Sequence, residues 1–222
     1  MICFDNTDIR KIAIHYNELG EKRILKNSLA NLDINKKVFL FYSKRRDVPI
    51  CALPKLKIIL SSKIGFLSFC YNFFAFANMY DCTVPVTSSS INSIGKFVIA
   101  HEVGHILDPD IYKTKDEYAV ILSTLIEKIL EYDLDIKLND LHKMSLPIEI
   151  EDCVIDLKRN LVSRETKAWN IAKSFLVFEN SKEEFLFNKV KEYALATYNF
   201  GNLKNIIKEH NLETYFKYRR YF

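Results

Sequence analysis

The chain has 222 residues, of which 49% are hydrophobic and 27% are charged, and these proportions are typical of a globular protein. It contains only five glycines and five prolines, which argues against an intrinsically disordered chain. The formal net charge of +4 is too small to indicate a polyanionic partner.

Charge is distributed unevenly along the chain. Residues 1–60 contain 12 Lys/Arg against 6 Asp/Glu, whereas residues 101–152 contain 5 against 13. We interpret the basic N-terminal part as a solvated surface, because its longest basic run, at 43–47, is too short to predict a nucleic-acid site. A nucleic-acid binder that uses this basic part is the weakest of three hypotheses for function.

Cysteine usage and the N-terminus favour a cytoplasmic protein. The five cysteines are odd in number and form no CxxC pair, which predicts reduced, mostly buried thiols in a reducing compartment. The N-terminus lacks a basic region followed by an apolar run, so we expect no secretory signal. The most apolar stretch, residues 64–80, is interrupted by polar residues, and we expect a buried helix or a pair of strands there rather than a membrane span.

The first half of the chain is predicted to combine helices with a few strands. Apolar residues at helical spacing predict amphipathic helices over 8–20 and 23–32. Compact β-branched and aromatic runs predict three strands, over 36–43, 56–62 and 82–90. The last of these contains Pro85, which places it at a sheet edge.

From Ile91 onward the pattern is helical. Helices are predicted over the following ranges: 92–107, 114–134, 149–178, 182–198 and 201–215. No internal repeat or flexible linker is present, so a single domain over 1–222 is the economical interpretation. The predicted fold class is α+β, with a small N-terminal sheet and helices followed by a mostly helical C-terminal half.

The stretch HEVGH, residues 101–105, fits the pattern H-E-x-x-H. On a helix, His101 and His105 are separated by about 400° of rotation, so both rings project from nearly the same line and can bind one metal ion. Glu102 is rotated by about 100° from His101, so it flanks the ion without binding it. The motif therefore predicts a zinc site in which Glu102 is the general base.

Two hydrogen-bonded histidines without a metal are the alternative interpretation. With this composition, H-E-x-x-H would arise by chance with a probability of roughly one in a hundred. However, His101 and His105 continue the apolar stripe of Ile94, Phe97 and Val98 and are expected to face the interior. Buried imidazoles need partners, and a metal ion satisfies both of them, so we favour metal binding.

A zinc site of this kind needs a third protein ligand and one open position. Glu165 is our candidate, because it lies in the middle of an apolar helical stripe with small alanines beside it. A carboxylate buried there needs a partner, which is either a metal ion or a basic side chain. The stripe consists of Leu157, Leu161, Glu165, Ala168, Ala172 and Phe175.

Asp108 is the second candidate for the third ligand. It falls almost in line with His101, but the following Pro109 favours an end of the helix there. We therefore favour a hydrogen bond from Asp108 to an imidazole N–H over ligation. An oxyanion stabiliser is also expected, and the sequence does not choose among four candidates, Tyr112, Tyr118, His142 and Arg164.

The segments FVIAHEVGHILDP (97–109) and RETKAWNIA (164–172) resemble the HExxH-plus-Glu zinc metallopeptidases, the gluzincin-like group. Within that group the chain is most similar to the ImmA/IrrE-type proteins of bacteria, phages and mobile elements, over about residues 90–176. The resemblance implies a zincin-like fold, a zinc ion (Zn²⁺) bound by His101, His105 and Glu165, and Glu102 as the catalytic residue. It also suggests a regulatory protein, such as a repressor, as the target.

The leading hypothesis is an intracellular zinc-dependent endopeptidase of narrow specificity, with a protein or peptide substrate and with neither a nucleic-acid nor a membrane partner. The alternative is a non-catalytic zinc-containing regulatory or binding protein of the same fold. The presence of Glu102 counts against this alternative, because a structural zinc site does not need a base.

Overall fold

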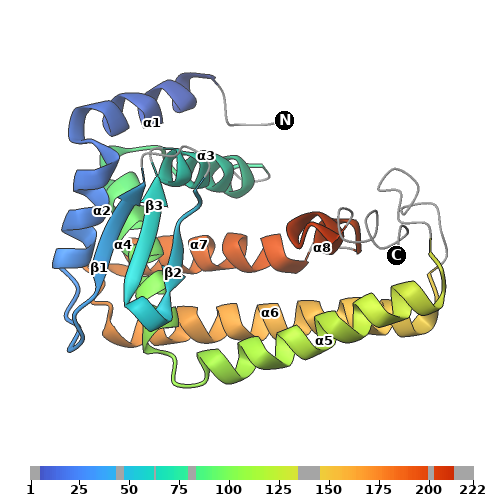
Figure 1. Cartoon of the computed structure of the whole chain (residues 1–222). Helices are drawn as coiled ribbons and strands as arrows, with labels where there is room; N and C mark the ends of the chain where they lie inside the picture. Colours follow the sequence, from blue (N-terminus) through green and yellow to red (C-terminus); the bar gives the residue numbers. More distant parts are fainter. Residues whose placement is uncertain are drawn as a thin grey trace. The chain divides into compact units, whose positions relative to one another are not determined.

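A computed structural model of the chain describes residues 6–43, 48–62, 64–79, 84–134, 146–199 and 203–212. Helices dominate and the N-terminal half contributes one small sheet, so the α+β prediction is confirmed (Figure 1). The chain packs as two compact units, Met1–Ile111 with Glu165–Ala194, and Tyr112–Arg164 with Leu195–Phe222. The single domain over 1–222 stays a prediction, because compact packing alone does not show whether each unit folds by itself.

The sheet belongs to the first unit and has the strand order β1-β3-β2. The central strand β3 (Ile58–Ser62) pairs in parallel with β1 (Phe39–Ser43) and antiparallel with β2 (Cys51–Leu53). The strands predicted over 36–43 and 56–62 are therefore confirmed.

Side chains alternate across the sheet, as the pleat requires. Ile59 and Ser61 are fully buried on the face that packs toward the helices. Phe39 and Phe41 lie on the opposite face and are exposed to solvent. One face of the sheet therefore belongs to the core, whereas the other remains open to solvent.

The third predicted strand, over 82–90, is wrong for the residues that the structure describes. Ser88–Leu107 forms helix α4, which begins with a capping box. The Thr87 hydroxyl accepts the Ser90 N–H at 3.1 Å, and the Ser90 hydroxyl accepts the Thr87 N–H at 2.9 Å. Thr87 and Ser90 thus cap a helix rather than belong to a strand. The third strand of the sheet is instead β2, which has three residues. Residues 82–83 lie outside the described residues.

The two helices predicted before the motif are confirmed as α1 (Asn6–Leu19) and α2 (Glu21–Ala30). Residues 64–80 were expected to form either a buried helix or a pair of strands, and the structure shows a helix, α3 (Gly65–Ala77). Helix α3 covers most of the apolar stretch 64–80 and buries Phe66, Cys70, Phe73 and Phe74 along one face. No helix within the described part of the chain has both the length and the apolar character that a membrane crossing requires.

Helix α4 passes through the core of the first unit, which confirms the helix predicted over 92–107. It lies against α2 and against β2 and β3, and Figure 1 shows it behind the strands. Gly95 permits the close approach of α2, because a Cβ at this position would lie 2.9 Å from Cγ2 of Ile24. On another side, the ring of Phe97 packs edge-on against Phe187 at 5.3 Å. Helix α4 is therefore held from several directions.

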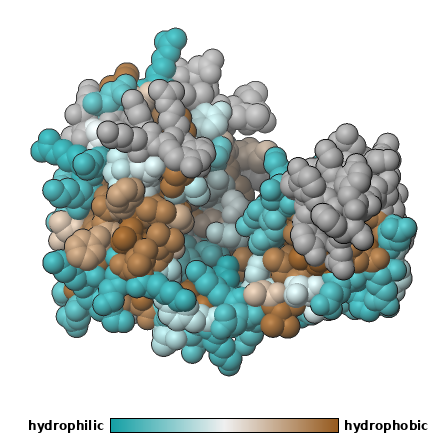
Figure 2. Space-filling model, in the orientation of Figure 1, coloured by the Kyte–Doolittle hydropathy of each residue, from teal (hydrophilic) through white to brown (hydrophobic). Residues whose placement is uncertain are grey.

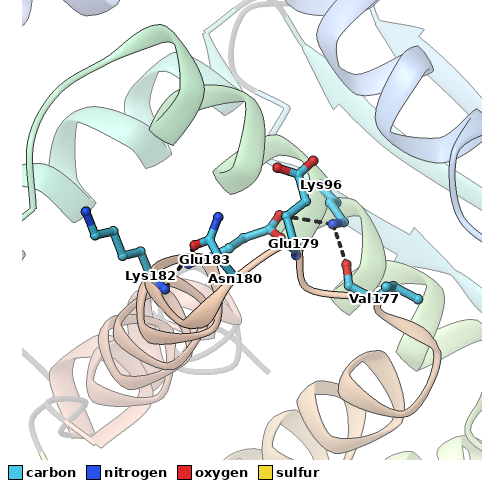
Figure 3. A network of polar contacts seen from close by, with 6 residues as sticks. All are labelled: Lys96, Val177, Glu179, Asn180, Lys182 and Glu183. Carbon is cyan, nitrogen blue, oxygen red and sulfur yellow. Dashed lines mark hydrogen bonds and ion pairs between the residues drawn. The ribbon is translucent and has the colours of Figure 1, made fainter.

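A polar network fixes α4 to the segment that precedes helix α7 (Ser181–Asn199), as Figure 3 shows. The Lys96 ammonium donates to the Val177 carbonyl at 2.8 Å and to the Glu183 carboxylate at 3.0 Å. The Asn180 side chain caps α7 by accepting the N–H groups of Lys182 and Glu183. The ion pair and the cap together position the start of α7 against α4.

The remaining predicted helices are also confirmed. They are α5 (Ile111–Glu131), α6 (Ile148–Phe175), α7 and α8 (Leu203–Glu209). The second unit has its own apolar core, formed by Leu125, Ile129, Ile150, Val154, Leu157, Leu203, Ile206, Ile207 and Leu212. Residues 201–202 and 213–215 of the last predicted helix lie outside the described residues.

The structure describes three of the five cysteines, and all three are reduced thiols. Cys51, Cys70 and Cys153 form no disulfide, as predicted for reduced cysteines. Burial raises the pKa of Cys70 far above its ordinary value, so this thiol packs as a small apolar group. Cys3 and Cys82 lie outside the described residues.

Candidate metal centre

Helix α4 carries the two histidines of the motif. His101 and His105 lie one turn apart, are both buried, and have ring centroids separated by 4.6 Å. The helix ends after Leu107, because Pro109 favours an extended backbone at Asp108, whose ψ is 115°. The motif therefore occupies the last two turns of α4, within the core of the first unit.

Helix α6 brings Glu165 to these two histidines. One carboxylate oxygen, Oε2, lies 3.0 Å from Nε2 of His101 and 3.2 Å from Nε2 of His105. Two zinc bonds of about 2.0–2.1 Å that meet at a tetrahedral angle place their ligand atoms roughly 3.3 Å apart. The three side chains therefore converge at a spacing that suits a shared metal ion. Among the described residues, they are the one set of His, Cys, Asp or Glu side chains that could hold an ion.

The two helices can approach this closely because position 104 is glycine. A Cβ at Gly104 would lie 2.2 Å from the carbonyl oxygen of Ala168 and 2.9 Å from its carbonyl carbon. Since Ala168 is three residues after Glu165, this contact lies beside the carboxylate. The sequence HEVGH thus supplies both histidines and the gap that admits the helix carrying the third group.

Burial and hydrogen bonding set the charge of the three groups. Burial lowers the pKa of His101, which favours the neutral imidazole that binds metals. Burial acts to raise the pKa of Glu165, but hydrogen bonds from His101 and His105 outweigh it and hold that pKa well below its ordinary range. The site therefore favours a neutral His101 imidazole beside an ionised Glu165 carboxylate.

Trp169 stacks on His101, with ring centroids 4.3 Å apart and an angle of 19° between the planes. It lies four residues after Glu165, so both side chains face α4 from the same side of α6. Nδ1 of His101 and Nε1 of Trp169 are buried and have no hydrogen-bond partner within the described part of the chain. The ring of His101 is therefore oriented by stacking and by its Nε2 contact, rather than by a hydrogen bond to Nδ1.

Glu102 is buried next to this group and is not a member of it. Burial raises its pKa to about 8, to which the charge of Glu165 adds, while His105 and a backbone hydrogen bond from Ala52 oppose the rise. Ala52 lies in β2, so the short strand that sequence reasoning missed contacts the predicted base. The geometry leaves Glu102 beside the three converging groups with a carboxyl that can exchange protons near neutral pH.

Asp108 has a different set of contacts from those predicted. Its buried carboxylate forms an ion pair with Lys167 at 2.7 Å through Oδ1, which also accepts the Asp110 N–H at 2.9 Å. Among the residues that the structure describes, Oδ2 has no hydrogen-bond partner, and no hydrogen bond joins this carboxylate to an imidazole. Lys167 lies on α6 and also pairs with Asp110, so it joins the end of α4 to the helix that carries Glu165. Sequence reasoning missed this role, because it predicted no partner for Lys167.

The candidate oxyanion stabilisers belong to the second unit or lie outside the described residues. The Tyr118 hydroxyl is 2.8 Å from Nε2 of His210, and the Arg164 guanidinium lies over the Tyr118 ring at 5.7 Å. Tyr112 is exposed, and His142 lies outside the described residues. Their role in stabilising an oxyanion stays a prediction.

Comparisons of the chain with known protein families, with curated proteins and with solved structures find no match.

Proposed function

We propose that this chain is a zinc-dependent endopeptidase. The observation that carries the proposal is the buried convergence of His101, His105 and Glu165, with Glu102 beside them. Two imidazole nitrogens and one carboxylate oxygen form a donor set of catalytic zinc sites, which keep a fourth position open. Imidazole ligands also make zinc a better fit than magnesium or calcium, which prefer oxygen ligands alone.

His101, His105 and Glu165 would hold the zinc ion. When bound, zinc lowers the pKa of a coordinated water toward about 7 and polarises the carbonyl of a substrate. A dication also favours ionised carboxylates nearby, so it would lower the pKa of Glu102 from its metal-free value of about 8. Glu102 would then accept a proton from water at its carboxylate and deliver that proton to the leaving amine.

The proposal extends to the fold family and the target. The resemblance of residues 90–176 to gluzincin-like peptidases supports a zincin-like fold and an intracellular protein substrate of narrow specificity. The alternative is a zinc-containing regulatory protein without turnover. The two differ in what Glu102 does, because a binding protein has no step that requires a base.

Glu102→Gln tests this difference. The variant keeps the shape of the side chain but removes the base, so we expect normal zinc content and loss of proteolysis. The assay compares zinc-loaded wild type with the variant on a native bacterial lysate and identifies new protein N-termini by mass spectrometry. New termini that appear with wild type and not with the variant support the endopeptidase. Identical termini with both proteins, at equal zinc content, would favour the regulatory alternative.

A further inference from the structure

A cavity of about 540 Å³ lies between α2 and β1, away from the metal centre. Its apolar wall is mostly aliphatic, and the residues that form it are Leu29, Ala30, Ile34, Val38, Phe39 and Leu40. No residue of β3 contributes to the lining, so the cavity lies along the side of β1 that faces away from the sheet. We call it the β1 groove.

Four lysines line the β1 groove: Lys22, Lys26, Lys36 and Lys37. Among the described residues, no carboxylate forms an ion pair with any of them, and Lys37 instead lies 5.1 Å from the centroid of the Phe39 ring. Like charges gathered at one cavity repel one another, and an anionic occupant would relieve that repulsion. The groove therefore favours a ligand that is acidic as well as apolar.

The strand beside the groove is an open edge. Within the described residues, β1 has a single neighbouring strand, β3, so it is an edge strand of the sheet. Phe39 and Phe41 on this strand are 51% and 57% exposed. They stand in register with Ile58 and Leu60 of β3, and Figure 2 shows apolar side chains gathered over this face. An open edge that carries an exposed apolar face is a site where an extended chain adds to a sheet.

We propose that the β1 groove binds an extended, acidic and apolar segment of a partner protein, which pairs with the open edge of β1. The backbone of the segment would bond to β1, its apolar side chains would continue the row of Phe39 and Phe41, and its carboxylates would face Lys22 and Lys26. A polypeptide fits better than a nucleic acid or a bilayer, because the wall is mostly aliphatic and the edge offers backbone amides. No residue of the metal centre lines the groove, so this inference does not depend on the proposed peptidase activity.

The test uses an octapeptide of alternating valine and glutamate, labelled with fluorescein and titrated with the full chain in a fluorescence anisotropy assay. We expect saturable binding that weakens as salt is raised. A valine–lysine octapeptide should not bind, because its charge matches that of the groove. The valine–glutamate peptide with every backbone amide N-methylated should bind at least about tenfold more weakly, since it cannot pair with a strand.

Charge reversal locates the site. The double variant Lys22→Glu with Lys26→Glu should weaken peptide binding by about tenfold or more. The matched control is Lys204→Glu with Lys208→Glu, which reverses two lysines at the same spacing on α8 and should bind as wild type does. Glu102→Gln should also bind as wild type does, which keeps this test separate from that of the peptidase.

Two results would overturn the inference. Equal affinity for the N-methylated peptide would show that charge alone attracts it, and this comparison needs only the wild-type chain. Preferential binding of phosphatidylglycerol vesicles or of single-stranded DNA, lost in the Lys22/Lys26 variant, would assign the surface to a membrane or to a nucleic acid instead.

Discussion

Gly104→Ala should break the metal centre without touching any of its ligands. The added Cβ would lie 2.2 Å from the Ala168 carbonyl oxygen and 3.2 Å from its Cα, and the three atoms nearest to it all belong to the backbone. A relaxed contact between carbon and oxygen is roughly 3.3 Å, so the two helices must separate by about 1 Å. Glu165, one turn away on the same helix, would move with them.

The size of the effect follows from two opposing contributions. Overpacking a core typically costs about 1–3 kcal/mol, and the upper end applies here because backbone cannot rotate out of the way. Alanine is a better helix former than glycine by about 1 kcal/mol, which offsets part of that cost. A net loss of about 2 kcal/mol lowers the Tm of a chain of this size by roughly 4–8 °C. Zinc affinity should fall by about 10–100-fold, as when the support of a ligand is lost.

Gly95→Ala is the matched control in the same helix. Its Cβ would meet side-chain atoms, of which Cγ2 of Ile24 is nearest at 2.9 Å, and a side chain can adjust. We expect a smaller loss of stability and an unchanged zinc affinity. Circular dichroism melting and isothermal titration calorimetry with zinc measure both quantities. A Gly104→Ala protein that matches Gly95→Ala in zinc affinity would refute the close packing of α4 on α6.

Two further predictions concern charge near the site. Lys167→Met leaves the buried carboxylate of Asp108 without its ion-pair partner, so the Tm should fall. Adding Asp108→Asn to the same chain removes the unpaired charge and should restore most of the lost Tm. A double variant that is no more stable than Lys167→Met alone would contradict the pairing. In zinc-free protein, burial raises the pKa of Glu102 to about 8, so the unfolded chain binds fewer protons than the folded chain between pH 4.5 and about 8. The free energy of unfolding of the wild-type chain therefore falls as pH rises through this interval, because Glu102 ionises more readily in the unfolded chain. The Tm of Glu102→Gln should exceed that of wild type by a difference that grows with pH. A difference that stays constant with pH would refute the raised pKa.

The convergence of the three candidate ligands followed from local pattern. The spacing of His101 and His105 requires only a helix, and Glu165 was conspicuous as a carboxylate in an apolar stripe. The contacts of Asp108 did not follow, because the proline after it removes it from the helix and its direction then depends on the position of Lys167 on α6. The hydrogen bond from Ala52 to Glu102 depends on tertiary packing in the same way.

The strands show where local pattern fails. β1 and β3 each have five residues and begin with a run of apolar or aromatic side chains, four in β1 and three in β3, which is long enough to recognise. β2 has three residues and no alternation, so only its pairing with β3 defines it. The run from Val84 to Thr87 is rich in β-branched residues, which suggested a strand. However, the hydroxyl groups of Thr87 and Ser90 form a capping box at the start of α4, and the chain is helical from Ser88 onward.

Zinc analysis of the purified chain tests the central claim most directly. After saturation with zinc and desalting, we expect about one zinc per chain, with imidazole nitrogen and carboxylate oxygen in its X-ray absorption spectrum. Glu165→Gln should lower zinc affinity at least about 100-fold, whereas Glu151→Gln, an exposed position on the same helix, should not change it. A wild-type chain that retains no zinc, or a Glu165→Gln chain that binds zinc as tightly as wild type, would contradict the assignment of His101, His105 and Glu165 as the metal centre.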